Sequence, residues 1–184
     1  MNLLFICTGN TCRSPMAEGY FNFVARKLGI DAAGKSAGIV ANDGQHASDY
    51  SVRAMRELFD IDISGHKAKS VTVAGMQSAD YVITMTKSHK LVLRGMFPEH
   101  EDKIFILSEF AYRCKNGMIN IKRENSDSDI KAPSSEGIKF NTIIEHQASQ
   151  YFEDIADPYY YGLDVYMETA KEIAEYIDGI IASM

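Results

Sequence analysis

The stretch Cys7-Thr8-Gly9-Asn10-Thr11-Cys12-Arg13-Ser14 decides how this chain is interpreted. It follows a short apolar run, Leu3 to Ile6, and it precedes Pro15 and a segment whose apolar residues recur every three to four positions. This pattern predicts a strand, a tight loop and the start of a helix. Backbone N–H groups in such a loop, together with the amino terminus of the helix, favour the binding of a small anion.

The same loop carries a nucleophile and a cation. The positive field of the loop favours the thiolate form of Cys7, which is the nucleophilic form, and Arg13 can bind two phosphoryl oxygens at once. A buried structural cysteine with a surface arginine is the alternative for this spacing alone. With the strand and helix around it, the loop predicts attack of Cys7 on phosphorus through a phosphocysteine intermediate, with no metal and no cofactor required.

The composition indicates an ordinary globular protein. The 184 residues, 46% hydrophobic and 24% charged, suffice for one well-buried domain. The net charge of −6 argues against a general nucleic-acid binder. No apolar run has the length of a membrane span and no secretory signal is recognised, so we expect no membrane contact. Three cysteines, two of them in one loop, favour a reducing, cytoplasmic location over a disulfide framework.

Strands and helices are expected to alternate along the chain. This alternation predicts an α/β domain with a parallel sheet and helices on both faces. Cys7 then lies at the carboxyl end of the first strand, where such sheets bind their ligands. The expected helices span 15–28, 51–59, 88–96 and about 166–180, and the expected strands span 3–6, 30–37, 80–85 and 103–107, with a helical turn through Phe110.

The region from about 114 to 150 differs in character from the rest of the chain. It is polar, with alternating charges and the run Pro133-Ser134-Ser135. We interpret it as an insertion into a single domain that spans 1–184. It leads towards Asp157, and we hypothesise a lid or recognition surface beside the site; a solvated excursion without a catalytic part is the alternative.

The stretch from Cys7 to Glu18 resembles the signature of the low-molecular-weight protein tyrosine phosphatases. The further matches lie at Lys35–Gly38, Gly65–Ala68, Ala79–Met85 and Asp157–Tyr159. They cover residues 1 to about 113 and about 151 to 184, whereas the insertion has no counterpart in the family pattern. The resemblance implies a single three-layer domain with a four-stranded parallel sheet, a phosphorylated protein as substrate, and inorganic phosphate as product or inhibitor.

The resemblance also implies roles for individual residues. Asp157 would protonate the leaving group and then activate water, although an Asp-Pro pair alone is typical of a turn. Ser14 would hydrogen-bond the Cys7 thiolate. Cys12 would either form a reversible disulfide with Cys7 or serve as a small buried residue. The residues expected to bind the substrate or its phosphate are Thr8, Gly9, Asn10, Thr11, Cys12, Ser14 and Tyr159. Ser36 and His66, with Asn10, are expected in the network that holds the loop.

Thr11 bears on which phosphorylated side chain is bound. Tyrosine-specific members commonly have a larger apolar residue there, whereas a threonine resembles the protein-arginine-phosphatase branch. A phosphoguanidinium brings N–H donors that an apolar wall would leave unpaired. The run Tyr159-Tyr160-Tyr161 replaces the Phe-Gly-Gly of that branch, which leaves the pocket shape open. We favour phosphoarginine over phosphotyrosine.

Two other functions fit part of the sequence. An arsenate reductase shares the loop by family resemblance but needs a further redox pair of cysteines, and only Cys114 is available downstream. A phosphocysteine relay module of a sugar-transport system would need the cysteine loop but neither Arg13 nor Asp157.

Overall fold

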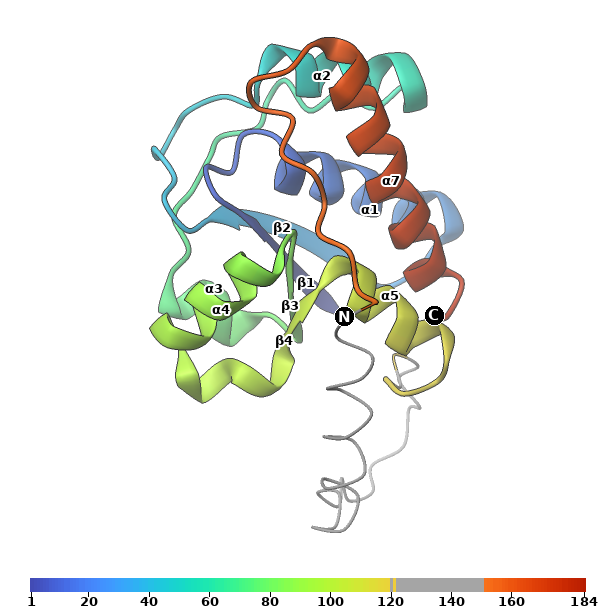
Figure 1. Ribbon diagram of the computed structural model, residues 1–184. Coiled ribbons are helices and arrows are strands. Elements are labelled where there is room, and N and C mark those ends of the chain that lie inside the picture. The colour runs from blue at the N-terminus through green and yellow to red at the C-terminus, as the bar shows by residue number, and fades with distance from the viewer. Residues whose placement is uncertain (120, 122–150) are drawn as a thin grey trace, which may run out of the picture.

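A four-stranded parallel sheet forms the centre of the protein (Figure 1). The structure is a computed structural model, and it describes residues 1–119, 121 and 151–184. The strand order is β2-β1-β3-β4, and every neighbouring pair is parallel, as predicted. The strands are β1 (Asn2–Cys7), β2 (Ala33–Gly38), β3 (Tyr81–Thr84) and β4 (Ile104–Ile106).

Helices cover both faces of this sheet, so the predicted three-layer arrangement is confirmed (Figure 1). Helices α1, α2, α5 and α7 lie on one side, and α3 and α4 lie on the other. Their bounds are α1 (Arg13–Leu28), α2 (Asp49–Phe59), α3 (Val73–Ser78), α4 (Lys87–Met96), α5 (Leu107–Lys115) and α7 (Leu163–Ile181), with a 3₁₀ helix, η1, at Pro98–Lys103.

The side chains of β1 alternate between two hydrophobic cores. Leu3 and Phe5 belong to the core beneath α1, α5 and α7, while Leu4 and Ile6 belong to the core beneath α3 and α4. A parallel sheet that is covered on both faces needs apolar side chains at every position of its central strand. This explains why the run before Cys7 is uniformly apolar. Each such side chain contributes about 1.5–3 kcal/mol on burial.

Several elements differ from the sequence-based expectations. Helix α3 and η1 were not predicted, because each spans only six residues and shows too little periodicity. Strand β2 begins at Ala33 rather than Ile30, because Gly29 adopts a left-handed conformation and Ile30 donates to the carbonyl of Ala25. Helix α5 continues beyond Phe110 to Lys115.

The expected insertion at 114–150 falls largely outside the described residues, and so does the hypothesis of a lid. Of the helices that the structure describes, none combines the length and the apolar character needed to cross a membrane.

The strand order places the Cys7–Ser14 loop at a turning point of the sheet. From β1 the chain crosses to β2 on one side and then returns to β3 on the other. Parallel sheets bind ligands at the carboxyl ends of the strands beside such a reversal. The loop after β1 occupies this position, as expected for Cys7.

Candidate active site

The Cys7–Ser14 loop connects β1 directly to α1 and packs tightly against β2. Asn10 adopts a left-handed conformation with a φ of 56°, which a short amide side chain tolerates better than most. A Cβ atom at Gly38 would lie 2.6 Å from the carbonyl oxygen of Thr8 and 3.0 Å from the backbone nitrogen of Asn10. Only glycine therefore allows β2 to approach the loop this closely.

Asn10 holds the loop from within. Its side chain is fully buried, and its Nδ2 donates to Ser14 Oγ at 2.9 Å and to Ser36 Oγ at 2.8 Å. Its Oδ1 accepts a hydrogen bond from the backbone nitrogen of Lys69 at 2.9 Å. One of these three hydrogen bonds lies within the loop, and the other two join the loop to β2 and to the segment after α2.

His66 and Glu18 extend this network. His66 Nε2 donates to the carbonyl oxygen of Asn10 at 2.9 Å, so the left-handed residue is held by its backbone as well. Ser36 donates to Glu18 Oε2, and that oxygen lies 3.9 Å from His66 Nδ1. The structure therefore brings together the expected supporting residues Asn10, Ser36 and His66, and it adds Glu18.

Cys7 lies at the bottom of the loop with polar groups around its sulfur. Its Sγ is 3.0 Å from Ser14 Oγ, and the residue is only 3% exposed. No backbone carbonyl in the described part of the chain accepts a hydrogen bond from the N–H groups of residues 8–12. The amino terminus of α1 has no side-chain cap. Unpaired donors around a cysteine sulfur suit a thiolate and a bound oxyanion.

Arg13 reaches from the first turn of α1 to the segment before α7. Its Nη2 donates to Asp157 Oδ2 at 2.5 Å, and its Nη1 donates to the carbonyl oxygen of Ile155 at 3.1 Å. The arginine side chain is 5% exposed, whereas that of Asp157 is 50% exposed. The third guanidinium nitrogen, Nε, is buried without a hydrogen-bond partner among the described residues. A buried donor of this kind is rare and indicates a ligand-binding role.

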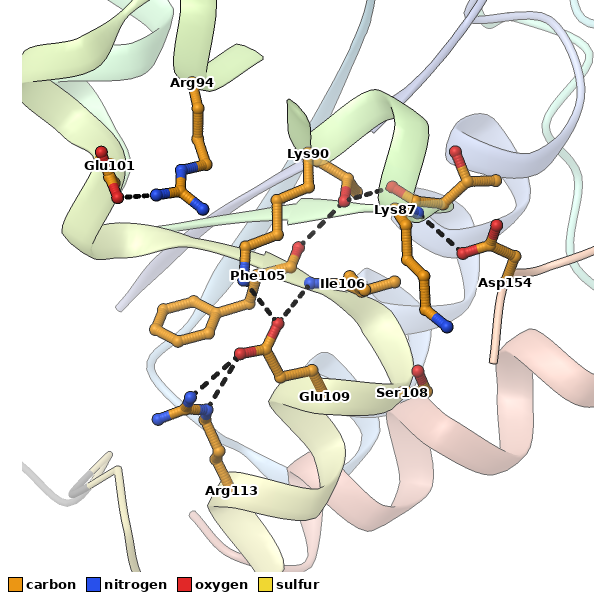
Figure 2. Close-up of polar contacts among 12 residues, drawn as sticks. Lys87, Lys90, Arg94, Glu101, Phe105, Ile106, Ser108, Glu109, Arg113 and Asp154 are labelled. Carbon is orange, nitrogen blue, oxygen red and sulfur yellow. Dashed lines mark hydrogen bonds and ion pairs between the residues drawn. The ribbon is translucent and has the colours of Figure 1, made fainter. Parts of the chain in front are cut away.

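The Glu153–Asp157 segment is fixed to the carboxyl ends of the neighbouring strands (Figure 2). The backbone of the segment and one carboxylate supply the contacts, which involve both α4 and α5. The three hydrogen bonds run from Ile155 N to Met85 O at 2.8 Å, from Lys87 N to Asp154 Oδ1 at 2.7 Å, and from Ser108 Oγ to Glu153 O at 2.9 Å. The backbone that leads to Asp157 is therefore held in place.

A buried carboxylate joins the two helices that hold this segment (Figure 2). Glu109 on α5 accepts from Lys90 Nζ of α4 at 2.8 Å and from Arg113 at 3.1 Å. It also accepts from the backbone nitrogen of Ile106 at 3.3 Å. Both cations lie over the ring of Phe105. A fully bonded carboxylate between two cations fixes the spacing of α4 and α5.

A cleft of about 390 Å³ opens above the loop. Eight of the residues expected at the site line it. Asn10 and Ser14 belong to the loop but do not line the cleft, and Ser36 and His66 lie behind the loop. The eight are Cys7, Thr8, Gly9, Thr11, Cys12, Arg13, Asp157 and Tyr159, and Val40, Asn42, Gln45 and Tyr160 complete the wall.

Cys12 belongs to a cluster of hydroxyl groups. Its Sγ lies 3.4 Å from Tyr166 OH and 3.6 Å from Ser48 Oγ. Burial is the main reason that the pKa of Tyr166 is raised, so the phenol stays neutral. All three cysteines are free thiols. Burial raises the pKa of Cys114 to about 12, which leaves this thiol neutral and unreactive.

Sequence reasoning gave no role to His89, on α4. Its Nε2 lies 2.9 Å from Thr8 Oγ1 at the rim of the cleft. The two residues are 81 positions apart, and no local pattern links them. Gly38 could have been noticed in the sequence, because it is a glycine at the end of the second expected strand. His89 could be found only from the tertiary structure.

Comparison with known proteins gives a consistent result. The family model described as low molecular weight phosphotyrosine protein phosphatase matches residues 2–131. The protein-arginine-phosphatase of Bacillus subtilis (strain 168) is 39% identical over 112 residues, which are 60% of this chain and 73% of that protein.

Solved structures of similar fold lead to the same family. The low molecular weight protein tyrosine phosphatase from T. tengcongensis has a TM-score of 0.76 and 36% identity, with 100% of this chain and 99% of that chain covered. A mutant of the YwlE arginine phosphatase, in which a serine introduced for an active-site cysteine is phosphorylated, has a TM-score of 0.73 and 27% identity, with 99% and 94% covered. The match to the family model spans well over half of the sequence, and the chain belongs to the low molecular weight phosphotyrosine protein phosphatase family.

Proposed function

We propose that this protein phosphatase uses Cys7 as nucleophile, Arg13 as the phosphoryl-binding cation and Asp157 as general acid and base. One observation carries the proposal: these three side chains line one cleft, at a loop in which the N–H groups of residues 8–12 have no backbone partner among the described residues. A covalent phosphoenzyme intermediate is supported by the relative in which the introduced active-site serine is phosphorylated.

In the first half of the reaction, the Cys7 thiolate attacks phosphorus in line with the leaving group. The bond from sulfur to phosphorus forms while the bond from phosphorus to the substrate nitrogen or oxygen breaks. The loop N–H groups, Arg13 Nε and the remaining guanidinium donors stabilise the negative charge on the phosphoryl oxygens. Asp157 delivers its proton to the departing atom.

In the second half, the carboxylate of Asp157 removes a proton from a water molecule that attacks the phosphocysteine. The phosphorus–sulfur bond breaks, inorganic phosphate forms, and the thiolate of Cys7 is restored. Ser14 Oγ, 3.0 Å from the sulfur, stabilises the departing thiolate by a hydrogen bond. Inorganic phosphate then competes with substrate for the same loop.

Phosphoarginine is the side chain that we favour as substrate. Thr8 and Thr11 line the cleft, and a threonine hydroxyl can accept a hydrogen bond from an N–H group of a guanidinium. An aliphatic wall would leave those donors unpaired. The relative from Bacillus subtilis that is named a protein-arginine-phosphatase supports this choice.

Phosphotyrosine is the second candidate, and a different observation favours it. Tyr159 and Tyr160 line the cleft opposite the loop and pack edge to face, with ring centroids 4.8 Å apart. They are 52% and 91% exposed, so an aromatic substrate ring could pack against them. The relative from T. tengcongensis is named a tyrosine phosphatase.

The two other functions fit this chain less well. An arsenate reductase needs a second reactive cysteine pair, and Cys114 is a buried thiol whose pKa is raised by burial. A phosphocysteine relay module has no use for the ion pair between Arg13 and Asp157. We also propose a cytoplasmic location, because a thiolate mechanism needs reduced cysteines.

The test compares peptides that carry phosphoarginine or phosphotyrosine, with wild type and with Thr11→Ile. We expect wild type to prefer phosphoarginine and Thr11→Ile to shift the ratio of kcat/KM about tenfold towards phosphotyrosine, because the hydroxyl acceptor is lost and an apolar contact is gained. An unshifted ratio would remove Thr11 from the specificity argument.

Cys7→Ser tests the nucleophile. It should abolish turnover of p-nitrophenyl phosphate and retain phosphate binding. Turnover at the wild-type rate in this variant would refute the mechanism.

A further inference from the structure

His89 connects α4 to the loop that carries Cys7. It lies in the first turn of α4, its side chain is 8% exposed, and its Nε2 is 2.9 Å from Thr8 Oγ1. The first turn is itself fixed, because the backbone nitrogen of His89 donates to Thr86 Oγ1 at 3.1 Å. Lys90, the next residue, is bound by Glu109 (Figure 2). The imidazole is therefore held in place from α4 and α5.

The charge state of His89 follows from its surroundings. Burial is the main cause that lowers its pKa to about 4, and the nearby Arg13 acts in the same direction. Asp157 and Asp154 oppose this effect without cancelling it. The ring is therefore neutral at neutral pH and carries a single N–H.

The position of that proton is set by the two ring nitrogens. Nδ1 is buried and has no hydrogen-bond partner in the part of the chain that is described. A buried N–H without a partner is rarer in proteins than a buried acceptor without one. The proton therefore resides on Nε2, and His89 donates to the oxygen of Thr8.

The hydrogen bond from His89 determines which hydrogen-bonding groups of the Thr8 hydroxyl remain free for a ligand. Thr8 is exposed and lines the cleft beside Cys7. With one lone pair engaged by His89, its hydroxyl retains a second lone pair and its own proton. It can accept an N–H from a substrate in a fixed direction. A guanidine nitrogen presents such an N–H next to phosphorus, whereas a phenol presents only carbon-bound hydrogens.

We propose that His89 is a positioning residue that orients the Thr8 hydroxyl, and that the pair selects phosphorylated nitrogen groups over phosphorylated phenols. This inference rests on the proposed phosphatase function and deepens it. It assigns part of the specificity to a residue on a separate helix, outside the Cys7–Ser14 loop. The pair acts through a hydrogen bond that the loop alone cannot make.

A double-mutant cycle tests the coupling. We measure kcat/KM for a phosphoarginine peptide and for p-nitrophenyl phosphate with wild type, Thr8→Val, His89→Leu and the double variant. Each single change should lower the ratio of the two constants about three- to tenfold, the effect of one lost hydrogen bond. The double variant should show no further loss, because His89 acts through Thr8. His89→Gln keeps an amide N–H at a similar reach and should recover most of the ratio.

A matched control is His100→Leu, a change of the same kind at a half-buried histidine of η1 that does not line the cleft. It should leave the ratio as in wild type. An unchanged ratio in His89→Leu, multiplicative losses in the double variant, or equal ratios in His89→Gln and His89→Leu would each overturn the inference. If wild type hydrolyses p-nitrophenyl phosphate but no phosphoarginine peptide, the inference fails and the phosphatase function stands; if it hydrolyses neither, the proposed function fails.

Discussion

Arg13 donates from two of its nitrogen atoms to the segment that carries Asp157, and a phosphoryl group has to share or displace these contacts when it binds. The Nη2 atom is the one paired with the carboxylate, while Nε has no partner among the described residues. The carboxylate is therefore both the proposed acid and a competitor of the substrate for the same cation. Removing it should affect chemistry and binding in opposite directions.

Asp157→Asn separates these two effects. Its kcat should fall about 10²- to 10⁴-fold with phenyl phosphate, because the phenolate that it releases is a poor leaving group. The fall should be smaller with p-nitrophenyl phosphate, whose leaving group needs less protonation. The inhibition constant of inorganic phosphate should stay equal or become lower, since a negative charge beside Arg13 is removed. Steady-state kinetics with both esters provides the measurement.

The control for this prediction is Asp102→Asn, which removes an exposed carboxylate of η1. It should leave kcat unchanged for both esters. Equal losses with the two esters in Asp157→Asn would contradict a role in proton transfer to the leaving group.

The residues of the site differ in how far the sequence could predict them. Cys7 and Arg13 belong to one local motif, so their chemistry was readable without a structure. The placement of Ser36 and His66 behind the loop was expected only from the family resemblance. His89 was not predicted, because its contact with Thr8 arises from the packing of α4, and neither neighbour in sequence indicates it.

At the scale of elements, β2 and the Cys7–Ser14 loop are matched to each other. Ile39 N donates to Cys7 O at 3.0 Å and Val40 N donates to Thr8 O at 2.9 Å, directly after Gly38. The backbone hydrogen bonds between β2 and β1 thus continue past Gly38 along the start of the loop. The alternation of strands and helices predicted this parallel arrangement, whereas the short α3 and η1 left no periodic signal.

Gly38→Ala should disturb the loop through this contact. The added methyl group would lie 2.6 Å from Thr8 O, which is backbone and cannot rotate away. We expect kcat/KM for p-nitrophenyl phosphate to fall at least about tenfold and the free energy of unfolding to fall by about 1–3 kcal/mol, as for an overpacked core. Kinetics and urea denaturation measure the two quantities.

Gly179→Ala is the matched control for Gly38→Ala. Gly179 lies in α7, and a methyl group there would meet nothing within 4 Å. This change should keep the kinetic constants and raise stability by about 0.5–1 kcal/mol through helix propensity. Wild-type kinetics in Gly38→Ala would show that the loop tolerates a shift of β2.

For the whole molecule, the site is an assembly of distant parts. The loop after β1, the end of β2, the first turn of α4 and the Glu153–Asp157 segment meet at the carboxyl edge of the sheet. They meet only when both cores are formed, since α1 packs on one face and α4 on the other. A group buried at this junction therefore couples its protonation to global stability.

His89 is that group, and the sign of its effect can be worked out. Its pKa in the folded protein is lowered to about 4, mainly by burial and then by Arg13, from an ordinary value of 6.5. Between these two values the unfolded chain binds more protons than the folded chain, so stability falls as the pH falls. Above about pH 6.5 the titration of His89 takes nothing from the free energy of unfolding. By pH 5 it should have lowered that free energy by about 2 kcal/mol.

His89→Gln removes this titration while keeping a polar side chain. Urea denaturation at pH 7.5 and pH 5 should show that wild type loses about 2 kcal/mol more than the variant between the two conditions. The difference in the free energy of unfolding between wild type and variant should therefore shift by about 2 kcal/mol in favour of the variant between pH 7.5 and pH 5. Equal losses in both proteins would mean that His89 is protonated without cost in the fold.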